Sequence, residues 1–184
     1  MCCSDSELAS LQIRFSSLTL DKEAIAAGGF GVVHRATHPQ FGLVAYKEFP
    51  WKYISPQDKE YNDLLKEAEM RKLNHPNIVR MIVFTFEPKH YGIVLEFMHR
   101  GGLDRLIHNE KIDISMKVRL LRDVVDGMCY LHGQQPPVIH SDLKLANILI
   151  TDDFVAKISD FGLTRWKENT STLSVGVTRG TVTH

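Results

Sequence analysis

Four polar residues that lie far apart along the chain have the functional groups needed to hold a phosphorylated ligand and a metal ion. Lys47 ends the apolar run VAYK, Asp142 and Asn147 lie in HSDLKLAN, and Asp160 opens DFG. An ammonium group is a point charge for phosphate, whereas carboxylate and amide oxygens can bind a divalent cation, and a carboxylate can act as a base. Each segment is expected where a strand meets a loop. Together the three segments predict a phosphate and metal site.

A glycine-rich segment, AGGFGVV at 27–33, precedes these motifs. Gly28 and Gly31, on either side of Phe30, let backbone N–H groups approach an anion closely because no Cβ stands in the way. A plain hairpin turn is the alternative. A dinucleotide-binding turn requires a helix to follow, and the strand-like VVHRA excludes it.

The first half of the chain reads as a small sheet with one helix. Residues 30–49 are rich in β-branched and aromatic residues around HPQFG, which predicts two strands and a turn. Ser55, Pro56 and Asp58 form a helix start, and the helix is expected to run to about residue 73. The runs at 78–86 and 91–97 predict two more strands around EPKH.

The second half is predominantly helical. After Gly101 and Gly102, a short helix is expected first, and then an amphipathic helix over about 115–132 that ends at Gly133. Short apolar runs bracket the polar motifs, and the Ser- and Thr-rich residues 168–183 are expected to form a mobile loop. These patterns favour an α+β fold.

Domain boundaries follow from the same changes in pattern. Residues 1–19 are expected to form a tail that docks as it enters the domain, residues 20–100 an amino-terminal lobe, and residues 101–184 a partial carboxy-terminal lobe.

Composition restricts the class of protein. The chain has 184 residues, 43% of them hydrophobic, which suits a globular domain. Lys plus Arg equals Asp plus Glu at 22 each, so the charge gives no reason to expect nucleic acid as a partner. No apolar stretch approaches the roughly 20 residues of a transmembrane segment. Three cysteines, Cys2, Cys3 and Cys129, form no disulfide framework, and we expect a cytoplasmic protein.

Taken in order, the glycine loop, VAYK, HSDLKLAN and DFG resemble the motif set of eukaryotic protein kinases. The chain also resembles receptor-interacting type serine/threonine kinases of the tyrosine-kinase-like group. Two features carry this resemblance: the segment KISDFGLTRW, and Ser141 at a position where most of the family has Arg. The resemblance covers about residues 20–184. It implies a bilobal fold with a five-stranded sheet and one helix in the amino-terminal lobe, and a mostly helical but incomplete second lobe ending in the activation segment.

The resemblance implies transfer of the γ-phosphate of ATP, with Mg²⁺, to Ser or Thr hydroxyls in intracellular signalling. Asp142 would accept or orient the hydroxyl proton, and Lys144 would neutralise the moving phosphoryl group. Lys47 would hold the α and β phosphates and pair with Glu67, for which Glu69 is the alternative. The metal ligands implied are Asn147 and Asp160.

A nucleotide pocket is also implied by the resemblance, although the first glycine of the loop pattern is replaced by Ala26. Its expected lining residues are Ile25, Gly28, Phe30, Gly31, Val33, Ala45, Lys47, Leu95, Glu96, Met98 and Leu149. Ser141 cannot pair with a phosphorylated activation segment as Arg does, so the resemblance implies switching that does not rely on such a pair.

The chain halts at GTVTH, before the Ala-Pro-Glu type motif of the family. Without the helices that follow it, the 115–132 helix is expected to expose part of an apolar stripe that comprises Val118, Leu121, Val124, Val125 and Met128. We therefore expect this chain to bind ATP weakly or not at all and to phosphorylate poorly, and a longer product with the same residues to be active. A non-catalytic nucleotide-binding or scaffolding module is the alternative. ATP, protein substrates and signalling-complex partners are the partners expected.

Overall fold

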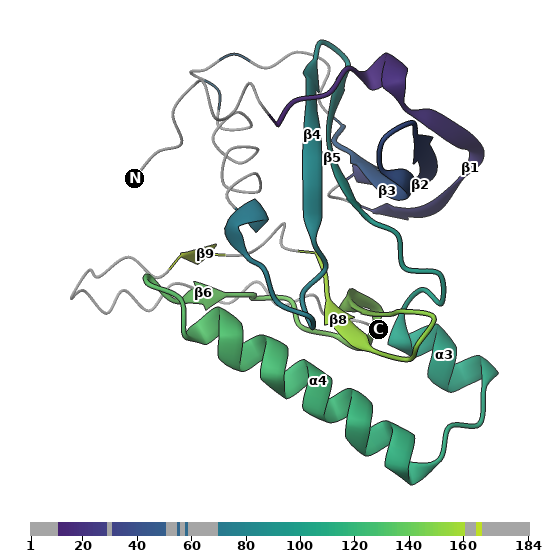
Figure 1. Cartoon of the computed structure of the whole chain (residues 1–184), viewed down its shortest axis with the longest axis vertical. Helices are drawn as coiled ribbons and strands as arrows, with labels where there is room; N and C mark the ends of the chain where they lie inside the picture. Colours follow the sequence, from purple (N-terminus) through teal and green to yellow (C-terminus); the bar gives the residue numbers. More distant parts are fainter. Residues whose placement is uncertain are drawn as a thin grey trace.

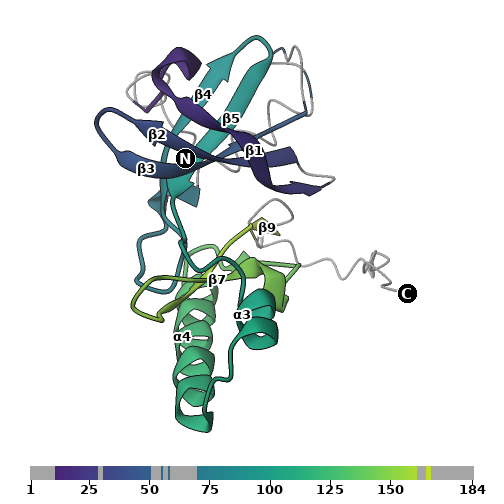
Figure 2. The ribbon, with the colours of Figure 1, turned by 90° about the vertical axis from the view of Figure 1, so that its right-hand side faces the viewer.

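A computed structural model of the chain places a β-sheet above a smaller helical part (Figures 1 and 2). The structure describes residues 11–28, 31–50, 55, 58 and 70–160, and the backbone of residues 165–166. Figure 2 shows the sheet above one long and one short helix, with residues 97–102 running between the two parts.

The upper part is a five-stranded antiparallel sheet, which confirms the predicted amino-terminal sheet. Its strands are β1 (Thr19–Gly28), β2 (Gly31–His38), β3 (Gly42–Glu48), β4 (Met81–Glu87) and β5 (His90–Glu96). The order in the sheet is β1-β2-β3-β5-β4, so β3 and β5 are neighbours although more than forty residues separate them in sequence. This pairing places the end of β5 beside the strand that carries Lys47.

The helix predicted from Ser55 to about residue 73 lies mostly outside the described residues. At its start, the backbone N–H of Ser55 donates to the Asp58 carboxylate, and the Asp58 N–H donates to the Ser55 carbonyl. The first of these bonds is one half of a capping box, in which the third residue satisfies a free N–H at the helix start. Near the predicted end, the 3-10 helix η2 (Met70–Lys72) is described.

The segment before β1 packs against the edge of the sheet. Phe84 of β4 donates its N–H to the carbonyl of Leu11, and its carbonyl accepts the N–H of Ile13, at 3.1 and 3.0 Å. The segment then turns through the 3-10 helix η1 (Phe15–Ser17), and the Phe15 ring stacks on His90 at 3.7 Å between centroids. These bonds extend the sheet beyond β4.

The lower part contains two helices and short strand pairs. Its elements are α3 (Leu103–Asn109), α4 (Ile114–His132), β6 (Val138–Ile139), the 3-10 helix η3 (Leu145–Asn147), β7 (Ile148–Ile150), β8 (Ala156–Ile158) and β9 (Arg165–Trp166). Asp113 caps α4 by accepting the N–H of Met116 at 2.7 Å, and the helix ends at Gly133 as predicted. Among the described helices, none combines the length and the apolar character needed to cross a bilayer.

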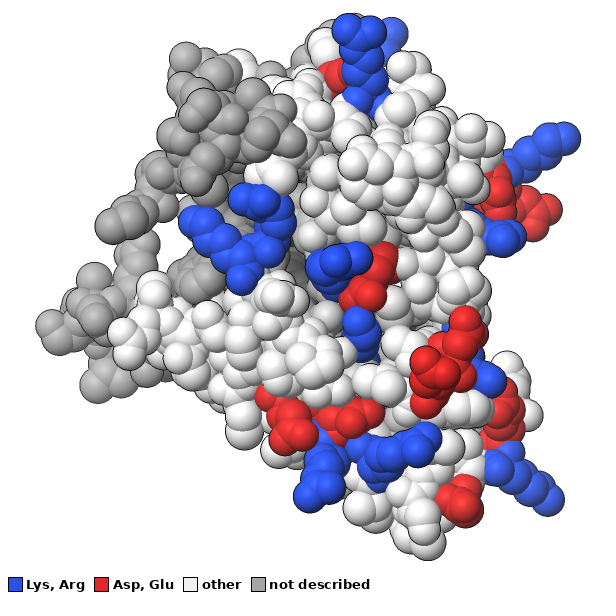
Figure 3. Space-filling view, in the orientation of Figure 1, with Lys and Arg blue, Asp and Glu red and all other residues white. Residues whose placement is uncertain are grey.

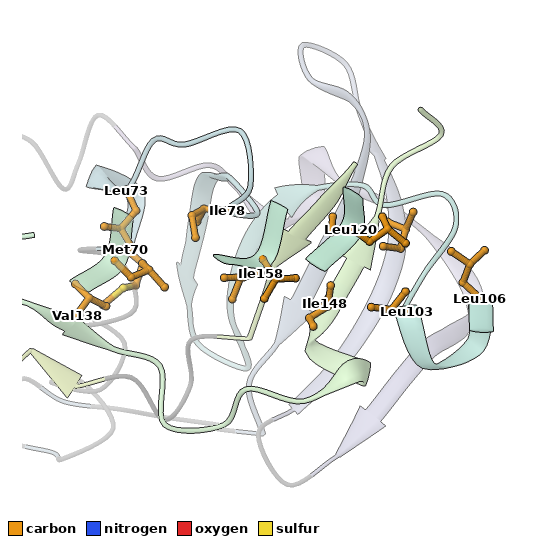
Figure 4. Close-up of a cluster of buried hydrophobic side chains, with 13 residues drawn as sticks. Met70, Leu73, Ile78, Leu103, Leu106, Leu120, Val138, Ile148 and Ile158 are labelled. Atoms are coloured by element: carbon orange, nitrogen blue, oxygen red, sulfur yellow. The ribbon is translucent and has the colours of Figure 1, made fainter. Parts of the chain in front are cut away.

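A core cluster fastens the two parts together (Figure 4). Met70, Leu73 and Ile78 come from the segment that leads into β4, and they join apolar side chains from α3, α4 and β6–β8. Gly127 permits this packing, because a Cβ there would lie 2.9 Å from the carbonyl oxygen of Asn77 and 2.9 Å from Ile158 Cδ1. The small residue therefore lets residues 75–79 lie directly on α4.

Helix α4 buries one face and leaves a second apolar face open to solvent. Val118, Leu121 and Val125 are 59%, 63% and 49% exposed, which confirms that part of the stripe faces water. Val124 of the same predicted stripe is buried, and Met128 is half-buried. In Figure 1 the helix runs along the lower edge of the molecule, away from the sheet.

Two adjacent leucines of α4 test this division. Leu120 is 2% exposed and Leu121 is 63% exposed. We expect Leu120→Ala to lower the free energy of unfolding by about 2–5 kcal/mol, because it opens a cavity in the core. The matched Leu121→Ala should change it by no more than about 0.5 kcal/mol, as is usual for a surface position. Chemical denaturation of both variants measures the difference, and equal losses would contradict the orientation of α4.

Candidate functional site

A cavity of about 530 Å³ lies between the sheet and the lower part of the molecule. It is lined by nearly all of the residues that the sequence assigned to a nucleotide and metal site, namely Ile25, Gly28, Gly31, Val33, Ala45, Lys47, Leu95, Glu96, Met98, Asn147, Leu149 and Asp160. Phe30, Glu67 and Glu69 lie outside the described residues. On the face shown in Figure 3, acidic and basic side chains are interspersed.

Lys47 and Asp160 meet inside the cavity. Lys47 Nζ lies 3.0 Å from Asp160 Oδ1, although 113 positions separate the two residues in sequence. The lysine side chain is 8% exposed and the aspartate side chain 33%. A buried ammonium group requires a partner of opposite charge, since removal from water is otherwise costly. The ion pair therefore holds a cation and a metal-type ligand side by side.

Asp142, Lys144 and Asn147 form a second hydrogen-bonded group. Lys144 Nζ lies 2.8 Å from Asp142 Oδ2. The Asn147 amide Nδ2 donates to the Asp142 carbonyl at 2.9 Å and to its carboxylate at 3.1 Å. Asn147 is buried at the end of η3, so these bonds fix the direction of its side chain. All three side chains come from the HSDLKLAN segment, as the sequence predicted.

The pKa of Asp142 lies below the ordinary value for an aspartate. The hydrogen bond from Lys144 is the main cause, and burial opposes it in part. The positive charge of Lys144 and the hydrogen bond from Asn147 also favour the ionised form. Asp142 is therefore a carboxylate at neutral pH.

His140 and Ser159 hold the backbone of the site residues in place through hydrogen bonds. His140 is 1% exposed, its Nε2 lies 2.8 Å from the Ser159 carbonyl, and its Nδ1 accepts the N–H of Asp142 at 3.3 Å. A proton on Nε2 satisfies both bonds. The Ser159 N–H and hydroxyl in turn both donate to the Asn147 carbonyl, at 2.8 and 3.0 Å. The backbones before Asp160 and around Asn147 are thus joined directly.

Two residues of the site have a left-handed backbone. Ser141 has φ +66° and Asp160 has φ +61°, values that non-glycine residues adopt at a cost of roughly 1–2 kcal/mol. The hydrogen bonds of their neighbours His140 and Ser159 hold both segments in place. Backbone strain of this kind concentrates at functional sites.

The two predicted glycines have different roles. Gly31 has φ +129°, and a Cβ there would collide with the Glu48 carbonyl of the neighbouring strand. Gly31 is therefore required by the close approach of β2 and β3. Among the residues that the structure describes, none has an atom within 4 Å of a Cβ built on Gly28, which lines the cavity.

Sequence reasoning missed part of the cavity wall and one of its charged neighbours. Met70, Val79, Met81 and Ile93 line the cavity, but their apolar side chains cannot be told from ordinary core residues in the sequence. Lys157 pairs with Glu96 at 2.8 Å. The sequence did contain a signal that Lys157 has a partner. It lies between Ala156 and Ile158, which are both buried, and a lysine in a buried strand needs a group of opposite charge.

The donor set fits a magnesium ion. Asn147 uses its Nδ2 in the bonds to Asp142, which leaves its amide oxygen as the possible ligand atom, and Asp160 adds a carboxylate. Magnesium is usually bound by one or two carboxylates together with substrate phosphates and water. Within the described part of the chain, no group of three or more His, Cys, Asp or Glu side chains gathers as a metal site. The two oxygen donors therefore suit a metal shared with a phosphorylated ligand.

Comparison with known proteins identifies the family. The profile described as "Protein kinase domain" matches residues 20–183. The chain is 38% identical over 157 residues to serine/threonine-protein kinase CTR1 of Arabidopsis thaliana, a match that covers 81% of the chain and 18% of that protein. It is also 38% identical over 155 residues to human receptor-interacting serine/threonine-protein kinase 1, covering 83% and 22%. Receptor-interacting serine/threonine-protein kinase 2 of Bos taurus is 33% identical over 152 residues, a match that covers 80% of the chain and 28% of that protein.

The chain belongs to the protein kinase domain family, and its resemblance to receptor-interacting type kinases is confirmed. It spans between about a sixth and a third of the length of these three relatives.

The Lys144 contact predicts a change in acid titration. Lys144→Met should raise the pKa of Asp142 toward its ordinary value, because the main hydrogen bond and a positive charge are lost. A group with a lowered folded pKa contributes stability above its unfolded pKa, and this contribution is lost as the pH falls through the folded pKa. The variant should therefore show a smaller loss of stability below the unfolded pKa of aspartate.

Carboxyl carbon NMR measures this titration, with Asp142→Asn used to assign the signal. Lys111→Met, an exposed lysine in the loop between α3 and α4, is the matched control and should leave the Asp142 titration unchanged. An unchanged curve in Lys144→Met would contradict the assigned cause.

Proposed function

We propose that this chain carries the ATP and magnesium site of a serine/threonine protein kinase that acts in intracellular signalling. The observation that carries the proposal is that Lys47, Asp160 and Asn147 line one cavity, with Lys47 3.0 Å from Asp160. Asp142 is not among the lining residues, but Asn147 Nδ2 lies 3.1 Å from its carboxylate and so ties it to the site. Membership of the protein kinase domain family supports the proposal. Relatives named as serine/threonine kinases favour Ser and Thr over Tyr as acceptors.

In this proposal the adenine lies between Val33 and Ala45 on the sheet side and Leu149 below, with the backbone of residues 96–98 along its edge. All of these residues line the cavity. Lys47 holds the α and β phosphates, and the Asn147 and Asp160 oxygens hold Mg²⁺. Magnesium, when bound, neutralises the charge on the phosphate oxygens.

During transfer, the hydroxyl oxygen of the acceptor forms a bond to the γ-phosphorus, and the bond from phosphorus to the bridging oxygen of ADP breaks. Asp142 accepts a hydrogen bond from the hydroxyl, aligns it for attack and takes up its proton late, as the bond to phosphorus forms. Since its pKa is lowered, Asp142 is a weak base, and orientation rather than early proton removal is its main contribution. Lys144, 2.8 Å from the same carboxylate, is placed to offset the negative charge of the moving phosphoryl group.

Ser141 supports a switch that does not depend on a phosphorylated activation segment. Its side chain is exposed, and its hydroxyl is 3.5 Å from the Ile139 carbonyl. A hydroxyl carries no charge to pair with a phosphate, unlike the Arg that is usual at this position. A cytoplasmic location and signalling-complex partners also remain predictions. The non-catalytic alternative is not favoured, because the relatives are named as kinases.

Phosphate transfer from radiolabelled ATP tests the proposal. The unaltered chain should label Ser and Thr, and not Tyr, in a protein or peptide mixture when Mg²⁺ is present. Asp160→Asn should lower the initial rate at least about 100-fold, because a charge that stabilises the transferring group is lost. The ratio of the two rates is the measurement.

Asp153→Asn is the matched control, since Asp153 is an exposed aspartate in the turn between β7 and β8. It should retain the unaltered rate. Transfer by the unaltered chain that does not exceed that of Asp160→Asn would contradict the proposed function, and labelling confined to Tyr would contradict the acceptor class.

A further inference from the structure

An ion pair next to the cavity joins the upper sheet to the lower part of the molecule. Lys157 Nζ lies 2.8 Å from Oε1 and 2.9 Å from Oε2 of Glu96. Glu96 Oε1 also accepts the backbone N–H of Arg80 at 2.7 Å. The lysine and glutamate side chains are only 16% and 21% exposed, so solvent screens this pair less than a surface pair.

Glu96 lines the cavity, whereas Lys157 does not itself line it but lies on the hairpin that forms the opposite wall. Glu96 is the last residue of β5 and lines the cavity on the sheet side. Lys157 is the central residue of β8, and its register partner in β7 is Leu149, which lines the cavity from below. Asp160 follows three positions after Lys157. The ion pair thus links the adenine edge of the site to the hairpin that provides its lower wall and leads to the metal ligand.

Backbone bonds already hold one side of β8 against the upper part. The Val79 N–H donates to the Ile158 carbonyl, and the Ile158 N–H donates to the Asn77 carbonyl, each at 2.9 Å. Glu96 is tied in turn to the start of β4, since its N–H donates to the Arg80 carbonyl at 3.0 Å. The ion pair between Lys157 and Glu96 adds a side-chain link from β8 to the end of β5.

We propose that Lys157 and Glu96 are positioning residues that set the separation of the two walls and thereby the affinity for adenine nucleotide. The inference rests on the proposed function. A planar base between two apolar walls depends on van der Waals contact, and a gap of about 0.5–1 Å forfeits about a quarter to a half of each contact energy. The pair acts through the walls and touches no reacting atom.

Nucleotide binding to four variants of the full chain tests this role. Glu96→Gln keeps an oxygen for the Arg80 N–H but removes the charge, and Lys157→Met keeps the apolar stem. Each should raise the dissociation constant for a fluorescent ADP analogue with Mg²⁺ about tenfold, which corresponds to about 1.4 kcal/mol. The double variant should be no weaker than the weaker single, because both changes remove one interaction. Lys157→Arg, which keeps the charge, should bind within about twofold of the unaltered protein.

A second measurement needs no nucleotide. Amide hydrogen exchange should accelerate at residues 96–98 and 157–160 in Glu96→Gln and Lys157→Met, because the two segments lose their link. Lys111→Met controls for the loss of a lysine and should alter neither measurement. In transfer assays the KM for ATP should rise more than kcat falls, a split that general destabilisation does not produce.

The outcomes separate the two proposals. Normal binding by the unaltered chain, with unchanged affinity and exchange in both single variants, overturns the positioning role and leaves the proposed function intact. Additive losses in the double variant also overturn it. Failure of the unaltered chain to bind the nucleotide analogue at millimolar concentration overturns the proposed function, and the positioning role with it.

Discussion

The buried contact between Lys47 and Asp160 is the constraint on which the site depends. An ammonium group that is 8% exposed loses most of its hydration, and the attraction between buried charges seldom repays that loss in full, even with the Asp160 carboxylate at 3.0 Å. A sequence selected for stability alone could place an apolar residue here at little cost. The retained charge instead leaves β3 of the sheet and the segment after β8 facing one another across a cavity, with a cation ready for an anionic ligand.

The remaining polar residues of the site satisfy one another's hydrogen-bonding groups. His140 bonds to the Ser159 carbonyl, Ser159 bonds twice to the Asn147 carbonyl, and Asn147 bonds to Asp142. Buried polar groups are tolerated only when each has a partner, and a connected network of this kind rigidifies its members. The motif HSDLKLAN and the residues before DFG are therefore one structural element, although their separation in sequence hides it.

Local pattern was enough to predict β2 to β5 and the two helices of the lower part, whereas β1 (Thr19–Gly28) was implied only by the family resemblance. The β-branched and aromatic residues around the turn at 38–42 located β2 and β3, and Gly133 located the end of α4. Long-range contacts were not predictable in the same way. The bonds of Leu11 and Ile13 to Phe84 join segments more than seventy residues apart. The sequence of a short apolar run does not indicate which strand it will pair with.

For the site, the sequence predicted which residues take part but not where their side chains point, and the reason is physical. Spacing and the family resemblance named the residues of the cavity, whereas the directions of their side chains depend on neighbours from other elements. Glu96 was expected at the adenine edge; it lines the cavity, and its carboxylate bonds to the Arg80 N–H and to Lys157. A charge in a buried strand signals that a partner exists, and only the fold tells which one.

The exposed apolar face of α4 does not weaken the geometry of the site. The polar network is anchored to the opposite face of this helix, where Leu120, Val124 and Leu131 pack with Ile158 of β8. Asp123 adds a hydrogen bond, since its carboxylate accepts the Ala156 N–H at 2.9 Å. Contacts on the inner face fix β8, and β8 leads directly to Asp160. The arrangement of charged groups and the exposure of Val118 and Leu121 are thus separable properties of one helix, because they belong to different sides of it.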